Sequence, residues 1–124
     1  MDRKTQGLIS YKKGHFSEKI ALLYLLFKGY IPIKTNWKTG RYTGAGEVDL
    51  ICRKGKHLVF VEVKKRTSFD ACADSLTPKF QKRQLKAADF FLNHFPKYSH
   101  LSLRFDTIWF VGLRIKHIKD IEVW

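Results

Sequence analysis

The sequence predicts a single α/β domain in which a mixed five-stranded sheet is flanked by helices, in the order α-β-β-β-α-β-β. The first observation is length, because 124 residues lie close to the commonest domain size of about 100–150 residues. The second is composition, since 44% of the residues are apolar and 15% aromatic, enough for one buried core. The third is the alternation of helix-length and strand-length apolar segments, without a repeat or a linker between them.

The first helix is predicted to begin with Ser17 as its N-cap and to end near Lys28, with Gly29 just beyond it. Its apolar residues go nearly all the way round, which predicts a helix that is buried on all sides. Residues 1–14 are polar and basic, and we expect a loose arm or the lead-in to this helix.

Three strands are predicted next. Residues 30–37 form the first, and Pro32 favours a sheet edge or a strand start, because proline cannot donate to the ladder. A glycine-rich loop over 38–46 follows. The next two strands, over 48–53 and 57–65, are apolar on both faces, as in a buried central hairpin.

The turn of this hairpin sets its register. Gly55-Lys56 places glycine at the first central position of a two-residue loop, the pattern of a type II′ turn. That loop puts Asp49 opposite Glu62 and Glu47 opposite Lys64, with all four side chains on one face. Three carboxylates and one ammonium group therefore gather at one end of an apolar hairpin, with Glu47 in a supporting position.

The second half of the chain predicts one loop, one helix and two strands. Residues 66–76 are expected to be a loop. Thr77 is predicted to cap a helix that has Pro78 at its first position and ends near Phe95. The last two strands are predicted over residues 103–111 and 115–123.

The charge balance points to a polyanionic partner. Lys and Arg total 24 against 11 Asp and Glu, which gives a formal net charge of +13. A strongly positive domain attracts polyanions, of which nucleic acid is the commonest. The apolar run 20–27 is too short for a membrane span of about 20 residues. Cys52 and Cys72 form neither a disulfide scaffold nor a four-cysteine zinc site. We therefore expect a cytoplasmic protein with no membrane association and with nucleic acid, DNA in particular, as its partner.

The carboxylate cluster suggests a metal site. Like charges opposite each other destabilise a sheet, and a divalent cation between Asp49 and Glu62 would relieve the repulsion. Carboxylate oxygens select Mg²⁺, Mn²⁺ or Ca²⁺ over zinc, and Lys64 is placed to stabilise developing negative charge or to position a water molecule. Together with the basic surface, this suggests phosphodiester hydrolysis. The alternative is a solvated strand end with ordinary surface ion pairs.

Two segments, GEVDLI at residues 46–51 and LVFVEVK at residues 58–64, resemble the D…ExK core of the restriction-endonuclease-like, or PD-(D/E)xK, nucleases. The chain is more closely similar to the YraN-like family of that superfamily, over roughly residues 14–111. The resemblance implies a restriction-endonuclease-like fold and a nuclease that depends on Mg²⁺ or Mn²⁺ and is related to archaeal Holliday-junction resolvases.

The resemblance also implies roles for individual residues. The positions that match the family's catalytic site are Asp49, Glu62, Lys64, Glu18 and Gln81. Asp49 and Glu62 would bind the metal ion together with the backbone carbonyl of Val63, and Lys64 would be the catalytic lysine. Glu18 also has an ordinary explanation, because a carboxylate in the first turn of a helix is favoured by the helix dipole. Gln81 and its neighbour Gln84 need hydrogen-bond partners, which either the site or the backbone supplies.

Four basic residues recur at intervals of three or four along the second helix, namely Lys79, Lys82, Arg83 and Lys86. We expect this face to contact phosphates, with a merely solvated face as the alternative. Arg41 in the glycine-rich loop is expected to contact the same nucleic acid. Phe90 lies on the basic side, where it either stacks on a base or covers apolar surface. Arg104 and Asp106 alternate along a strand, which favours a structural ion pair.

The sequence thus supports an endonuclease that acts on DNA, with structure-specific cleavage or junction resolution as possible activities. The alternative is a non-catalytic nucleic-acid-binding protein, or a subunit of a DNA-processing complex, that keeps the nuclease fold. A pure binder has no need to place carboxylates against phosphate, which favours the enzyme. The sequence leaves the substrate's structure and a homodimer open.

Overall fold

A computed structural model of the chain describes residues 16–40 and 43–121. Its elements, in chain order, are the N-terminal helix (residues 16–27), β1 (Ile31–Lys38), β2 (Glu47–Lys54), β3 (His57–Lys65), α2 (Phe69–Asp74), α3 (Pro78–His94), the 3-10 helix η1 (Pro96–Tyr98), β4 (Ser102–Val111) and β5 (Arg114–Ile118). The arm predicted over residues 1–14 lies outside the described residues. No helix in the described part of the chain is long and apolar enough to cross a membrane.

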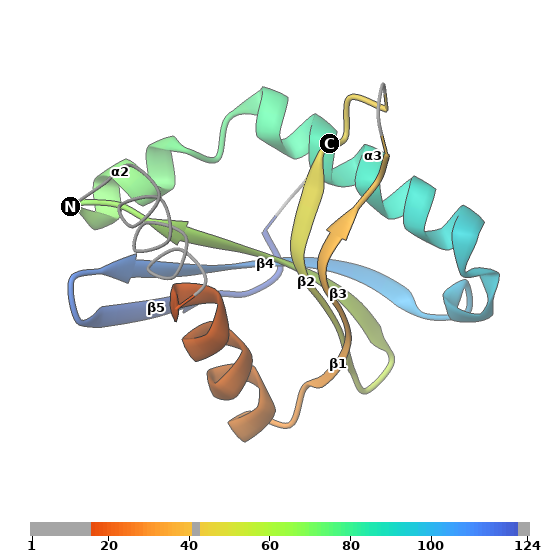
Figure 1. Cartoon of the computed structure of the whole chain (residues 1–124), viewed down its shortest axis with the longest axis horizontal. Helices are drawn as coiled ribbons and strands as arrows, with labels where there is room; N and C mark the ends of the chain where they lie inside the picture. The colour runs from red at the N-terminus through yellow and green to blue at the C-terminus, as the bar shows by residue number, and fades with distance from the viewer. Residues whose placement is uncertain (1–15, 41–42, 122–124) are drawn as a thin grey trace, which may run out of the picture.

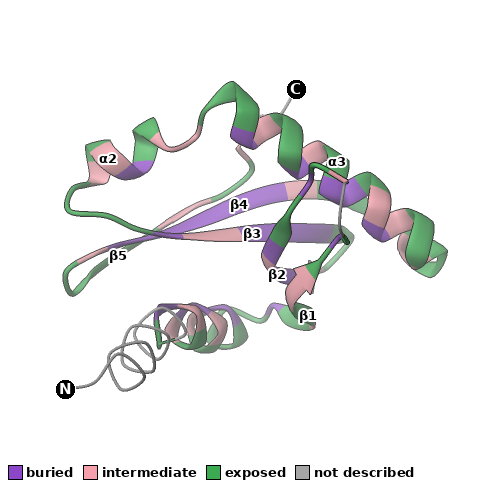
Figure 2. Ribbon diagram, turned by 45° about the horizontal axis from the view of Figure 1, so that its top comes forward, coloured by how far each residue is buried: buried purple, intermediate pink, exposed green. Residues whose placement is uncertain are grey.

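The five strands form one mixed sheet in the order β1-β2-β3-β4-β5, as predicted. β3 and β4 are parallel, and the other neighbouring pairs are antiparallel. Helices α2 and α3 lie over one face of the sheet and the N-terminal helix lies against the other (Figures 1 and 2). This α/β arrangement confirms the predicted fold class and is compatible with a restriction-endonuclease-like fold.

Pro32 lies in a strand at the edge of the sheet, as predicted. β1 is an edge strand, where proline is tolerated, and its register against β2 shifts between Pro32 and Lys34. The hairpin turn also follows the prediction, because Gly55 has a φ of 58°. β2 and β3 pair from Lys54–His57 to Leu50–Val61, which confirms the predicted register along this stretch.

Two predictions about the N-terminal helix were wrong. Ser17 is inside the helix rather than its N-cap, since Phe16 is already helical. The helix is also not buried on all sides, because Leu23 and Phe27 are 57% and 91% exposed. Only the stripe that contains Ala21 and Leu25 faces the sheet, and the sheet covers one side of the helix alone.

The predicted loop over residues 66–76 was wrong in its middle, which forms helix α2. Ser68 caps this helix by accepting a hydrogen bond from the backbone N–H of Ala71 at 3.0 Å. The next helix begins as predicted, with the Thr77 hydroxyl accepting from the N–H of Phe80 at 3.1 Å.

The last strand is shorter than predicted. β5 ends at Ile118, and Asp120 adopts a left-handed φ of 55° that turns the chain out of the sheet. The backbone N–H of Asp120 then donates to the carboxylate of Asp106 at 3.0 Å instead of to a strand.

The core has two parts, one on each face of the sheet. Phe60, Phe91 and Phe105 centre the part under α3, with Phe60–Phe91 ring centroids 5.7 Å apart. Leu25 and Val61 belong to the part under the N-terminal helix. The middle of β3 is apolar and buried on both faces, whereas Glu62, Lys64 and Lys65 lie toward its C-terminal end, close to Asp49.

Candidate active site

Asp49 lies where the central hairpin stops pairing. The described pairs end at Leu50–Val61, and the next interaction across the gap is a hydrogen bond from the backbone N–H of Val63 to Asp49 Oδ2 at 2.8 Å. In a regular strand, residues two positions apart face the same side of the sheet. β2 departs from this rule here, because Val48 packs under α3 whereas Leu50 packs under the N-terminal helix. The Asp49 carboxylate therefore replaces the backbone carbonyl that would accept from Val63 in a continued ladder, and it holds β3 to β2 at the point where the two strands separate.

Glu62 and Lys64 lie on the α3 side of β3, two positions apart and therefore on the same face. Lys64 Nζ is 3.5 Å from Glu62 Oε1 and 4.6 Å from the centre of the Phe80 ring. The Glu62 carbonyl accepts a hydrogen bond from the Thr107 hydroxyl at 2.9 Å, which ties this part of β3 to β4. The lysine and glutamate are thus held close together, largely out of solvent.

The carboxyl group of Asp49 is difficult to ionise. Burial raises its pKa to about 6, against the lowering effect of the hydrogen bond from Val63. The negative charges of Glu18 and Glu47 raise it further, and the positive charge of Lys64 lowers it. Asp49 is therefore within electrostatic range of the other charged residues that the sequence analysis placed at this site.

Glu62 shows the same behaviour. Burial raises its pKa to about 7, and the neighbouring charge of Asp49 adds to the effect. Lys64 and Arg83 lower the pKa, but not enough to cancel the rise. Two neighbouring carboxyl groups that titrate near neutral pH form an interacting pair of the kind that concentrates at functional sites.

Asn36 joins two further carboxylates to the site. With its amide nitrogen turned toward them, the orientation that satisfies both amide atoms, it donates to Glu18 Oε2 at 2.7 Å and to Glu47 Oε1 at 3.2 Å. Asn36 itself has a φ of 50°, a conformation that asparagine tolerates better than most residues. The structure thus connects Glu18 on the N-terminal helix to Glu47, the first residue of β2. Sequence reasoning missed Asn36.

The two glutamines of α3 have different surroundings. Gln81 Nε2 donates to the backbone carbonyl of Leu76 at 3.3 Å, so the backbone is its partner. Gln84 is buried and lines a narrow depression together with Glu47 and Glu62. Its Oε1 has no hydrogen-bond partner within the described structure. Of the two, Gln84 is the one with an acceptor still to be satisfied beside the carboxylates.

The basic face of α3 adjoins this depression. Lys79, Lys82, Arg83 and Lys86 are all exposed and, with Gly44 of the glycine-rich loop, line a depression of about 300 Å³. Arg83 also lines the narrow depression beside Glu62. Of the predicted phosphate-contacting residues, Arg83 lies beside the Glu62 carboxylate, and Lys79, Lys82 and Lys86 line the neighbouring depression. Arg41, which belongs to the same prediction, lies outside the described residues.

The donor set at the site suits a hard divalent cation. In the described ranges no group of three or more His, Cys, Asp or Glu side chains is arranged to hold a metal ion. Asp49 and Glu62 would instead supply two carboxylates beside the backbone carbonyl of Val63, and Mg²⁺ commonly uses one or two protein carboxylates and keeps several water ligands. Burial is the main reason that the pKa of both carboxyl groups is raised, and a cation bound between them would favour their ionised form. The residues therefore fit Mg²⁺ or Mn²⁺.

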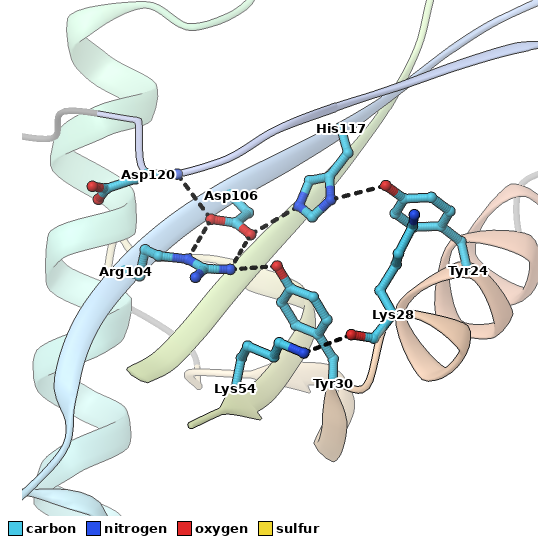
Figure 3. A network of polar contacts seen from close by, with 8 residues as sticks. All are labelled: Tyr24, Lys28, Tyr30, Lys54, Arg104, Asp106, His117 and Asp120. Atoms are coloured by element: carbon cyan, nitrogen blue, oxygen red, sulfur yellow. Dashed lines mark hydrogen bonds and ion pairs between the residues drawn. The ribbon is translucent and has the colours of Figure 1, made fainter. Parts of the chain in front are cut away.

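A second polar cluster lies on the opposite face of the sheet (Figure 3). The buried carboxylate of Asp106 accepts hydrogen bonds from Arg104 at 3.0 and 2.9 Å and contacts His117 Nε2 at 2.8 Å. Arg104 also donates to the hydroxyl of Tyr30. Burial alone would raise the pKa of Asp106, but hydrogen bonds from His117 and Arg104 outweigh it and lower that pKa. The expected Arg104–Asp106 ion pair is confirmed, and this cluster is structural.

Fold and site together define a basic α/β domain that carries buried carboxylates at the end of a central hairpin. The family model described as Uncharacterised protein family UPF0102 matches residues 17–110. UPF0102 proteins of Paramagnetospirillum magneticum and Parvibaculum lavamentivorans are each 40% identical to the chain, over 88% and 92% of it and 85% and 84% of their own lengths. A UPF0102 protein of Brucella canis is 36% identical over 86% of the chain and 82% of its own length. The chain belongs to the UPF0102 family.

Proposed function

We propose that this protein is a restriction-endonuclease-like enzyme that hydrolyses phosphodiester bonds of DNA with the help of Mg²⁺ or Mn²⁺. The observation that carries the proposal is the placement of Asp49, Glu62 and Lys64 around the opened end of the β2–β3 hairpin, next to a helix face of exposed lysines and arginine. The order of these residues along two adjacent strands matches the D…ExK pattern of that superfamily.

Some residues of the chain position the carboxylates, and others are placed to interact with the phosphate of the substrate. The N–H of Val63 fixes the Asp49 carboxylate, and Thr107 fixes the backbone at Glu62. A divalent cation bound by the two carboxylates would activate a water molecule and neutralise charge on the phosphate oxygens. Lys64, whose ammonium group lies 3.5 Å from Glu62, is placed to stabilise negative charge that develops on a phosphate oxygen.

Arg83 connects the two regions. It lines the narrow depression with Glu62 and the basic depression with Lys82 and Lys86, so a phosphate held by its guanidinium group would lie beside the carboxylates. Arginine suits this position because its planar group binds two phosphate oxygens at once.

A non-catalytic nucleic-acid-binding protein is the second candidate function. It is favoured by the Lys64–Glu62 ion pair, which engages the two side chains with each other, and by the exposure of the basic face. In this alternative the carboxylates would bind neither metal nor reacting phosphate, and the basic face alone would be functional.

Cleavage assays distinguish the two candidates. Duplex, single-stranded, flapped and four-way DNA are incubated with the protein in Mg²⁺, Mn²⁺ or EDTA. We expect metal-dependent cleavage of at least one form, which Asp49→Asn, Glu62→Gln and Lys64→Ala each abolish. Asp74→Asn on α2 is the control, because it removes one exposed negative charge from a residue outside the proposed site, and it should leave cleavage unchanged. Binding without cleavage of any form, in both metals, would leave the non-catalytic candidate.

A further inference from the structure

We propose that a groove along α3 leads from the carboxylates to a pocket for an unpaired nucleic-acid base, formed around Phe90. The inference rests on the proposed function and deepens it, because it names the substrate class. The substrate is DNA with a single-stranded segment next to the bond that is cleaved.

Three depressions follow one another along α3, between that helix and loop residues 43–47. Arg83 lines both the first, beside Glu62, and the second, the basic depression. Lys86 lines both the second and a third of about 280 Å³. Loop and helix approach each other closely at the middle, where a Cβ on Gly44 would lie 3.7 Å from Lys86 Nζ. Because neighbouring depressions share a lining residue, the three lie in a row along α3, and this row is the proposed groove.

The groove changes its chemistry along its length. The middle depression is lined by Lys79, Lys82, Arg83 and Lys86, which suit phosphates. The third depression contains Phe90, Asp89, Asn93 and Thr43 beside Lys86. Here Asp89 repels a phosphate but accepts a hydrogen bond from an exocyclic amino group, and Asn93 both donates and accepts. The part-exposed ring of Phe90 offers a surface for stacking. This end of the groove therefore suits a base and not the backbone.

The spacing allows one strand to reach both ends. Phe90 is seven residues beyond Arg83, which corresponds to about 10 Å along a helix axis. That distance is about three nucleotides at the roughly 3.4 Å rise of one strand in a duplex. A base inside a duplex is paired and stacked, so it cannot enter a pocket between a loop and a helix while its phosphates follow the lysines. The base in the pocket must therefore be unpaired.

Binding measured without catalysis tests the proposal. Fluorescence anisotropy in EDTA compares a single-stranded oligonucleotide with the same sequence as a duplex. We expect Phe90→Leu to weaken single-strand binding by on the order of tenfold and duplex binding little, because the stacking contact is lost. Phe90→Tyr keeps an aromatic ring and should bind like the wild type. Phe27→Leu is the matched control, since that ring is 91% exposed on the N-terminal helix.

A fluorescent base analogue reports the contact directly. An oligonucleotide that carries 2-aminopurine should lose fluorescence on binding to the wild type and to Phe90→Tyr, and retain it with Phe90→Leu, whose fold is checked by its melting temperature. Equal loss of single-strand and duplex affinity in Phe90→Leu, or unchanged quenching, would overturn the base pocket. Single-strand preference without any metal-dependent cleavage would overturn the nuclease and keep the pocket, so the two failures are distinguishable.

Discussion

The carboxylate of Asp49 accepts a hydrogen bond from the backbone N–H of Val63 at 2.8 Å, directly beyond the last paired residues of the central hairpin. This contact has two consequences. It satisfies a donor that the opened ladder would leave without a partner, and it buries a negative charge beside Glu62. The feature that shapes the site therefore also introduces the repulsion that a cation would relieve.

Removal of the Asp49 charge should stabilise the protein. The pKa of Asp49 is raised in the folded state, so its deprotonation costs folding free energy as the pH rises from the unfolded value of 3.8 through about 6. One pKa unit corresponds to about 1.4 kcal/mol, and we expect Asp49→Asn to gain on the order of 1 kcal/mol at pH 7. The gain should shrink toward pH 4. Urea unfolding in EDTA at both pH values measures it.

Asp49→Ala separates the charge from the hydrogen bond. Alanine leaves the N–H of Val63 without its acceptor, which costs about 1–3 kcal/mol when the group is buried. We therefore expect Asp49→Ala to be less stable than Asp49→Asn at every pH. Similar stability of the two variants would mean that the bond to Val63 contributes nothing.

Asp106 has the opposite pH dependence. Its lowered pKa means that its charge stabilises the fold above the unfolded value, and that this stability is lost as the pH falls through the lowered folded value. Asp106→Asn removes a buried, paired carboxylate, and such losses cost about 3–5 kcal/mol. We expect a large drop in the urea midpoint at pH 7 and a weaker acid dependence than in the wild type.

Much of the fold was predictable because it depends on local rules. The Gly55 turn determined the hairpin register, Thr77 and Pro78 determined the start of α3, and continuous apolar runs identified the buried strands. Helix α2 was missed because six residues are too few to show a helical repeat of apolar residues, although Ser68 followed by Asp70 is an ordinary signal for a helix start.

The proximity of Asp49, Glu62 and Lys64 was predictable from the hairpin register, but the way in which they are held was not. The break in β2 at Asp49 depends on one side-chain-to-backbone hydrogen bond, which no spacing encodes. Which glutamine faces the carboxylates depends on the rotation of α3 against the sheet, a packing property. His117 contacts Asp106 on the neighbouring strand and Tyr24, which is 93 residues away in the chain, and a contact over such a separation carries no sequence signal.

The salt dependence of DNA binding should report the basic face of α3. Each phosphate contact contributes a slope of about −0.9 to log K against log[salt] on duplex DNA. Replacement of Lys82 and Arg83 together by alanine should flatten the slope by about two contacts. The control is a double alanine variant of Lys56 and Arg114, which removes the same charge from an exposed turn residue and from the exposed first residue of β5. Equal flattening in both variants would assign the effect to net charge alone.

Metal binding should be visible as thermal stabilisation, independent of turnover. A ligand that binds only the folded state at 100 times its dissociation constant adds about 2.7 kcal/mol, so saturating Mn²⁺ should raise the melting temperature of the wild type. Asp49→Asn should abolish this rise because it removes a ligand, whereas Lys64→Ala should keep it, since the ammonium group competes with a cation for Glu62. Differential scanning fluorimetry with Mn²⁺, Mg²⁺ and EDTA measures all three proteins. A rise that survives in Asp49→Asn would place the metal elsewhere.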